Sequence, residues 1–188
     1  MPLVPPAMAA SIYPSLLGVG CLGIGTPKLA LGVALGLAAW SRAVRVPITA
    51  AGVVGTGIVA MPLLVPSPLL LPALLGAFTS AGMLGIFTPV FAVGLSQGIA
   101  AALLPGIITA AVPGVGSGAG VATFRGTAVP FMIQGFASAG LVGPGAVKEA
   151  RAIGQGLDTF FAGFSMPVIV VGPSGPGPGA ATVTGQIL

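Results

Sequence analysis

Residues 46–124 contain no charged side chain and no histidine, and this stretch limits the possible folds more than any other feature of the chain. In an ordinary soluble domain about a quarter of the residues are charged, whereas only 4% of this 188-residue chain is charged. A water-exposed monomer would need a polar face over such a length, so something other than water must cover this surface. The covering material is either lipid or polypeptide.

An internal repeat is the second feature. The phrase FTSAGMLG at 78–85 returns almost unchanged as FASAGLVG at 136–143. A shift of 58 residues aligns the middle copy with the last, and a shift of 62 aligns an earlier copy with the middle one. We therefore predict three tandem copies of one supersecondary unit. The chain then divides into an N-terminal arm at 1–12, repeat 1 at 13–64, a proline-rich apolar connector at 65–77, repeat 2 at 78–126, a second connector at 127–135 and repeat 3 at 136–188.

Each copy is predicted to contain a helix, a strand and a glycine ladder, in that order. We expect helices at about 26–40, 88–103 and 144–161, the first two opening on a Thr-Pro pair with threonine as N-cap. Stretches rich in β-branched residues, such as GIITAAV at 106–112, follow as strands, and alternating glycines, such as those of GVGSGAG at 114–120, suit closely passing backbones. The predicted fold class is α+β, with the three helix–strand–glycine-ladder repeats packed together. A pseudo-threefold arrangement is a hypothesis based on the copy number, and the alternative fold is an all-α membrane protein.

Small residues recur four positions apart in the three expected helices, and such pairs let two helices approach closely. We interpret them as packing sites between repeats rather than as a transmembrane dimer motif, because the spacing also occurs in the charged third helix. The expected packing residues are Gly32, Gly36, Gly94, Gly98, Ala152 and Gly156. Helical spacing in the third copy also predicts one exposed charged face. Its residues are Lys148, Glu149, Arg151 and Asp158.

The apolar segments are poorly suited to spanning a bilayer. A spanning helix needs about 20 mostly apolar residues, but only thirteen uncharged residues separate Lys28 from Arg42. Four prolines interrupt the most hydropathic region between Pro62 and Pro72, and irregular backbone is not tolerated against lipid. We therefore expect that region to be an extended apolar strap buried against protein. The segment 87–108 is long enough to insert, so the membrane alternative stays open.

The residues that usually carry chemistry are almost missing. With no histidine, two acids and one cysteine, the chain lacks the usual general acids, general bases and metal ligands. We expect Glu149 and Asp158 to be solvated on a helix face and Cys21 to fill apolar space. GVGSGAG lacks the Lys-Ser/Thr of a phosphate-binding loop, and the six cations are too scattered for a nucleic-acid interface. No catalytic, cofactor-binding or metal-binding residue is assigned, and we expect no enzymatic activity and no specific nucleic-acid partner.

Three motifs carry a resemblance to a known class of proteins. They are S-A-G-x-x-G, P-x-x-x-x-x-x-x-A-x-G-x-G-L and the closing ladder G-x-G-x-G-A-A-T-V-T-G. Over most of its length the chain resembles small glycine-rich, repeat-containing virion proteins of contractile-tailed bacteriophages. The resemblance implies a structural component of the tail, baseplate hub or neck, located in the virion and without a carried-over active site.

Repeats that cannot bury their own apolar faces pack against one another and against neighbouring subunits. We therefore expect a buried packing or plug element whose partners are other virion subunits or copies of itself. The alternative is a small integral membrane protein, either a holin-like pore or a genome-delivery channel or pilot protein that contacts the host membrane transiently. Its location would then be the membrane.

Overall fold

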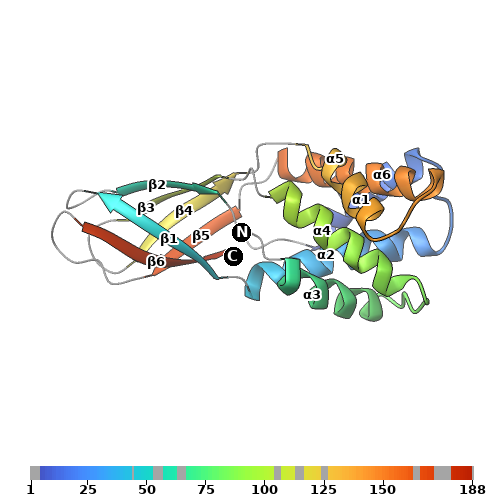
Figure 1. Cartoon of the computed structure of the whole chain (residues 1–188), viewed down its shortest axis with the longest axis horizontal. Coiled ribbons are helices and arrows are strands. Elements are labelled where there is room, and N and C mark those ends of the chain that lie inside the picture. The colour runs from blue at the N-terminus through green and yellow to red at the C-terminus, as the bar shows by residue number, and fades with distance from the viewer. Residues whose placement is uncertain are drawn as a thin grey trace.

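A computed structural model describes the backbone of residues 5–43, 45–52, 57–62, 67–103, 107–112, 117–123, 127–162, 166–171 and 179–187. Side-chain surroundings are described for residues 5–42, 68, 70–103 and 127–162, which lie in six helices and the segments beside them. The helices are α1 Pro5–Gly18, α2 Gly25–Ala43, α3 Ser67–Ser80, α4 Thr88–Leu103, α5 Val129–Ser138 and α6 Pro144–Ala162. They form three helical hairpins, α1–α2, α3–α4 and α5–α6 (Figure 1).

The repeated sequence phrase forms the turn of each hairpin. Gly20, Gly82 and Gly140 follow α1, α3 and α5 with φ angles of +83°, +74° and +80°, a left-handed conformation that glycine adopts without steric cost. The next residue donates its N–H to a carbonyl five residues back, as from Cys21 to Leu16 at 3.0 Å. Met83 and Leu141 make the same bond to Phe78 and Phe136 at 2.9 Å. This is the Schellman motif, which satisfies carbonyls at a helix end.

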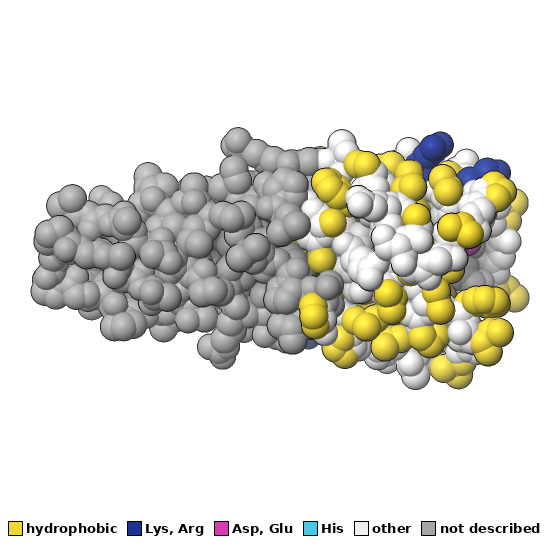
Figure 2. Space-filling model, viewed as in Figure 1, with side chains coloured by type: hydrophobic (Ala, Val, Ile, Leu, Met, Phe, Trp, Pro, Cys, Tyr) yellow, Lys and Arg dark blue, Asp and Glu magenta, His cyan; other side chains and the backbone are white. Residues whose placement is uncertain are grey.

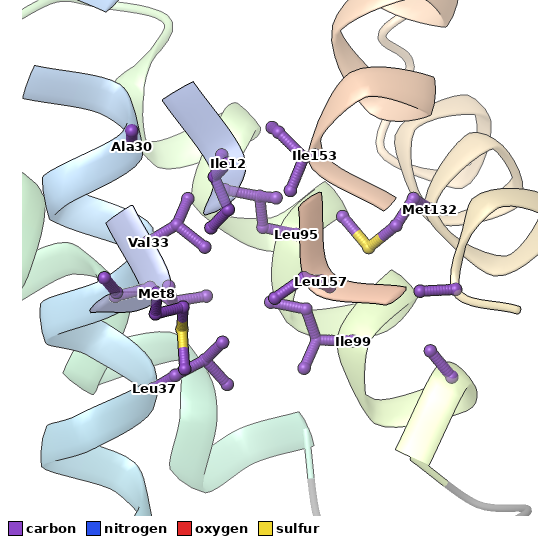
Figure 3. Packing of buried hydrophobic residues seen from close by; sticks show 14 of the residues in the cluster. Met8, Ile12, Ala30, Val33, Leu37, Leu95, Ile99, Met132, Ile153 and Leu157 are labelled. Atoms are coloured by element: carbon purple, nitrogen blue, oxygen red, sulfur yellow. The ribbon is translucent and has the colours of Figure 1, made fainter. Parts of the chain in front are cut away.

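The three hairpins close into a ring. Each helix packs mainly on two others, and the sequence of neighbours runs from α1 through α6 and back to α1. Helices α2, α4 and α6 bury most of their surface, whereas α1, α3 and α5 each bury one stripe. Side chains such as Ile12, Val33, Leu95 and Ile153 converge inside the ring from different helices (Figure 3). Each hairpin therefore packs on both of the others.

Glycines of α2, α4 and α6 permit the closest contacts between hairpins. A Cβ built on Gly36 of α2 would lie 3.0 Å from the Leu74 Cα of α3, and one on Gly98 of α4 would lie 2.9 Å from the Met132 Cα of α5. A Cβ on Gly156 of α6 would lie 2.5 Å from the Ile12 Cα of α1. Each glycine therefore admits the first helix of the next hairpin, and the third contact closes the ring.

The other sequence-predicted packing residues lie at the same interfaces. Cβ atoms on Gly32 and Gly94 would meet Phe78 of α3 and Phe136 of α5. Ala152 is fully buried in the helical core. Phe91 of α4 bridges neighbouring hairpins, because its ring centroid lies 6.0 Å from that of Phe78 and 4.9 Å from that of Phe136.

A pair of strands follows each helical hairpin in the sequence. The strands are β1 Arg45–Gly52, β2 Gly57–Pro62, β3 Ile107–Val112, β4 Ser117–Thr123, β5 Met166–Val171 and β6 Gly179–Ile187. They form one antiparallel sheet of order β1-β6-β5-β4-β3-β2, in which Arg45 pairs with Gln186 and Gly52 with Gly179. The edge strands β1 and β2 also contact each other, so the sheet curls toward closure. The sheet and the helical ring occupy opposite ends of the molecule (Figure 1).

The predicted α+β fold class, with three helix–strand–glycine-ladder repeats packed together, is wrong. Wherever the structure describes side-chain packing, the protein is all-helical, as the alternative fold anticipated. The physical reason is the first helix of each hairpin, which the sequence analysis did not predict and which covers the apolar face of the second. The ladder residues 53–56, 113–116 and 172–178 lie outside the described residues.

Segments expected to be irregular turn out to be these first helices. The predicted N-terminal arm at 1–12 contains most of α1, and the connector at 127–135 contains most of α5. The proline-rich apolar connector at 65–77, part of which was expected to be an extended strap, lies largely in α3. Pro72 lies inside α3 but is exposed, so the carbonyl that loses its helical hydrogen bond can face water. The expected helices at 26–40, 88–103 and 144–161 are confirmed as α2, α4 and α6.

Candidate functional site at the turn end of the ring

The three hairpin turns lie together at the end of the ring that is remote from the sheet (Figure 1), and we call this region the turn end. Large apolar side chains at the turns are 70–86% exposed, whereas the side chains of the helical core are buried. They are Leu22, Ile24, Leu84, Ile86, Phe87 and Val142. Leu22, Leu84 and Val142 occupy the same position in the three copies. The turns therefore present an apolar rim that recurs around the ring.

Threonine hydroxyls fasten two of the turns to the helices that follow. The Thr26 hydroxyl donates a 2.9 Å hydrogen bond to the Cys21 carbonyl, and the Thr88 hydroxyl accepts one from the Gly85 N–H at 3.1 Å. Both threonines were expected to be helix N-caps. In the described contacts their hydroxyls instead bond within the turn, which holds the exposed apolar residues in a fixed loop.

A pocket of about 540 Å³ lies inside the apolar rim. All three hairpins line it, because Cys21 and Leu29 come from the first, Phe87 and Phe91 from the second and Glu149 from the third. The 58- and 62-residue shifts of the repeat place Leu29, Phe91 and Glu149 at one equivalent position. The first two hairpins supply all of the pocket lining except Glu149. One of the three equivalent wall positions is therefore a carboxylate instead of an apolar side chain.

The Glu149 carboxyl group is half-buried at this position. Burial raises its pKa above the ordinary value of 4.5, because a carboxylate loses hydration when it leaves water. None of the described residues donates a hydrogen bond to it or forms an ion pair with it. The third hairpin thus supplies a partly dehydrated negative charge with no hydrogen-bond or ion-pair partner among the described residues.

Cys21 lies on the same wall and is half-buried. Burial raises the pKa of its thiol, the nearby Glu149 carboxylate raises it further, and Lys148 lowers it. The thiol form is therefore favoured, as for a packed side chain rather than a nucleophile. This agrees with the expectation that Cys21 fills apolar space.

The residues expected to form one charged face of α6 lie in three different surroundings. Lys148 and Arg151 are exposed, whereas Glu149 and Asp158 are half-buried. Asp158 accepts a 2.6 Å hydrogen bond from the Ala128 N–H at the start of α5, where helices leave backbone donors unsatisfied. Burial raises the pKa of Asp158, and this hydrogen bond opposes the increase. Asp158 therefore fastens α6 to α5 and does not reach the pocket.

Cations lie beside the apolar rim. The Lys28 ammonium nitrogen lies 3.4 Å from the position of a Cβ built on Gly82, in the turn of the next hairpin. Lys148 is close enough to Cys21 to influence its pKa. Lys and Arg side chains gather at the same end of the helical part in Figure 2, among hydrophobic side chains. The turn end thus combines an apolar rim, flanking cations and one carboxylate in the pocket.

The described residues contain no group of three or more histidine, cysteine, aspartate or glutamate side chains that could hold a metal ion. Within the described part of the chain, no helix has both the length and the apolar character needed to cross a membrane. The pocket was not predicted, because helical spacing placed Glu149 on an exposed face. The repeat alignment contained the missing signal, since it sets Glu149 against Leu29 and Phe91.

No protein family, curated protein or solved structure matches the chain.

Proposed function

We propose that the protein is a non-enzymatic structural component of a larger particle and that it docks onto neighbouring subunits through its turn end. The observation that carries this proposal is the apolar rim, which exposes equivalent side chains from all three hairpins. Exposed apolar side chains that gather in one place are typical of interaction sites. Three equivalent contacts around one axis suit a partner ring with threefold symmetry.

The resemblance to glycine-rich virion proteins suggests where such a ring would be. Tails, baseplate hubs and necks of contractile-tailed bacteriophages are expected locations for a plug or packing element. The elongated form, with the sheet at one end and the helical ring at the other (Figure 1), suits a molecule placed along such an axis. Partners would be other virion subunits or further copies of this chain.

The position of the protein in a purified particle tests this proposal. We expect mass spectrometry to find the chain in intact particles and a density map at side-chain resolution to show subunits against Leu22, Leu84 and Val142. Replacement of these three residues by serine should deplete the chain from particles. Replacement of exposed Thr79, Ser80 and Thr159 by alanine, as a control, should leave it in place. Absence of the wild-type chain from particles would contradict the proposal.

A second function is supported by the charge of the same surface. Exposed apolar loops flanked by Lys28, Lys148 and Arg151 also suit contact with an anionic bilayer. In this version of the membrane alternative the protein contacts the bilayer during genome delivery without a spanning helix. Co-sedimentation with vesicles of phosphatidylcholine and phosphatidylglycerol distinguishes the two: a virion component should stay in the supernatant, whereas a protein that contacts an anionic bilayer through this surface should pellet with the vesicles.

A further inference from the structure

The pocket at the turn end contains one repeated position that is not chemically the same in the three hairpins. Leu29 and Phe91 make this position apolar in the first two hairpins, and Glu149 makes it acidic in the third. A leucine or phenylalanine at Glu149 would complete an apolar wall of the kind already present twice. The carboxylate therefore makes one of three equivalent positions able to recognise charge.

Within the described part of the chain, no contact offsets the partial dehydration of Glu149. No described residue donates a hydrogen bond to its carboxylate, and burial alone accounts for the raised pKa of the group. Asp158 on the same helix shows the contrast, because it accepts a backbone hydrogen bond at 2.6 Å. A half-buried carboxylate without a partner is destabilising unless a cation or a donor pairs with it. A cation from a binding partner would give Glu149 the pairing that no described residue supplies.

The surroundings of the carboxylate restrict the kind of cation that fits. Phe87 and Phe91 line the same pocket, and aromatic faces attract ammonium and guanidinium groups. The rim outside the pocket is apolar, with Ile86 and Leu22 each about four-fifths exposed. A hydrated metal ion gains nothing from such a rim, whereas a cation on an apolar stem gains from both parts.

We infer that the turn end receives a protein partner that inserts one lysine or arginine side chain into the pocket, onto Glu149, while its apolar surface covers the rim. This inference rests on the proposed function and specifies the chemistry of the docking partner. Lysine and arginine both combine an apolar stem with a charged head, and a charge-assisted hydrogen bond to the carboxylate would supply the missing pair. An anionic bilayer fits less well, because its phosphate groups repel the Glu149 carboxylate.

The first experiment measures recognition of the cation alone. The full-length protein is titrated with n-butylammonium and, separately, with uncharged n-butanol, and binding is followed by NMR shifts of Gly20, Cys21 and Thr26. We expect Glu149→Gln to weaken butylammonium binding about tenfold, because the charge-assisted pair is lost, and to leave butanol binding unchanged. Equal butylammonium affinity for wild-type protein and Glu149→Gln would overturn the inference.

Two further variants control this measurement. Arg151→Gln changes an exposed charge on the same helix and should alter the butylammonium affinity by less than about twofold, since screened surface charges interact weakly. Glu149→Leu gives the third hairpin the apolar side chain that the first hairpin has at this position. The variant should fold but lose cation binding. Its circular dichroism spectrum and melting temperature keep loss of binding distinct from loss of structure.

The second experiment asks whether the cation belongs to a protein. The probes are acetyl-Leu-Lys-Leu-amide and a matched peptide with norleucine in place of lysine. We expect the lysine peptide to bind at least about tenfold more tightly than butylammonium, since its leucines cover the rim, and Ile86→Ser to weaken only the peptide. A peptide that binds no more tightly than butylammonium would overturn the assignment to a side chain.

The bilayer is tested as a competing occupant. Vesicles of phosphatidylcholine with phosphatidylglycerol should bind the wild-type protein and Glu149→Gln weakly. Tight vesicle binding that increases in Glu149→Gln would overturn the inference in favour of lipid. Failure of the inference can be told from failure of the proposed function. In the first case Glu149→Gln retains cation binding while serine variants of the rim still deplete particles, and in the second the wild-type chain is absent from particles.

Discussion

Hairpins α1–α2 and α3–α4 place Leu29 and Phe91 where hairpin α5–α6 places Glu149, although all three share one turn and one packing geometry. The shared parts are the Schellman glycines and the close helix contacts at Gly36, Gly98 and Gly156. Four of the six charged residues whose surroundings the structure describes lie on α6. The comparison shows that backbone conformation and helix spacing are repeated three times, while charge is concentrated in one copy.

The largest expected effect comes from the repeated close contacts. Gly36→Leu, Gly98→Leu and Gly156→Leu should each lower the free energy of unfolding by about 3 kcal/mol, because backbone atoms of the next helix occupy the space of the new side chain. Urea denaturation measures the change. Equal losses would show that the third interface is held like the others. A Gly156→Leu protein as stable as wild type would mean that α6 does not close the ring on α1.

The next effect separates the third hairpin from the first two. Asp158→Ala should cost about 1–2 kcal/mol, because the Ala128 N–H loses its 2.6 Å acceptor. Asp158→Asn keeps an oxygen acceptor and should recover most of the stability. The repeat places Ala100 at the position of Asp158, so no corresponding hydrogen bond is expected in the second hairpin. Equal thermal stability of the alanine and asparagine variants would contradict this role.

A smaller and opposite effect is expected at the pocket. Glu149→Leu should raise the free energy of unfolding at pH 7 by about 0.5–1 kcal/mol, because a half-buried apolar side chain replaces a dehydrated carboxylate. The converse variant, Leu29→Glu, adds a carboxylate to the first hairpin at a position that is only 7% exposed. It should lower stability by a larger amount, about 3 kcal/mol. Loss of stability in Glu149→Leu would show that the carboxylate has an internal partner.

The pH dependence follows from the raised pKa values of both acids. Between the ordinary pKa of a carboxyl group, 4.5 for Glu149 and 3.8 for Asp158, and its higher native value, the native protein binds more protons than the unfolded chain. Stability therefore falls as pH rises through this window and is greatest below it. Thermal melts from pH 4 to pH 7 should show this trend, and it should be weaker in Glu149→Leu. A wild-type melting temperature that falls on acidification would contradict the sign.

The smallest effect tests whether glycine matters away from the contacts. A Cβ on Gly76 of α3 would meet nothing within 4 Å, so Gly76→Ala should raise the free energy of unfolding by about 0.5–1 kcal/mol through helix propensity. It is also the matched control for the three leucine variants. A destabilised Gly76→Ala protein would show that packing outside the described residues uses this glycine.

Sequence analysis located the second helix of each hairpin because its proline start and long apolar run are local signals. It missed α1, α3 and α5, in which prolines mask a stripe with a spacing of four, such as Met8, Ile12 and Leu16. Helical spacing alone placed Glu149 with Lys148 and Arg151. Its burial depends on where three turns meet, which is a property of the closed ring and not of one helix.

Closure of the ring through α1 and α6 has a consequence during synthesis of the protein. The first helix leaves the ribosome long before its last neighbour exists, so the nascent chain carries an unsealed apolar seam until translation is almost complete. The sheet also depends on late synthesis, because its first strand, β1, pairs with its last strand, β6. Truncation at either terminus should therefore disrupt both ends of the molecule, whereas a circular permutant that joins the two termini and opens a different hairpin connection could retain the same closure.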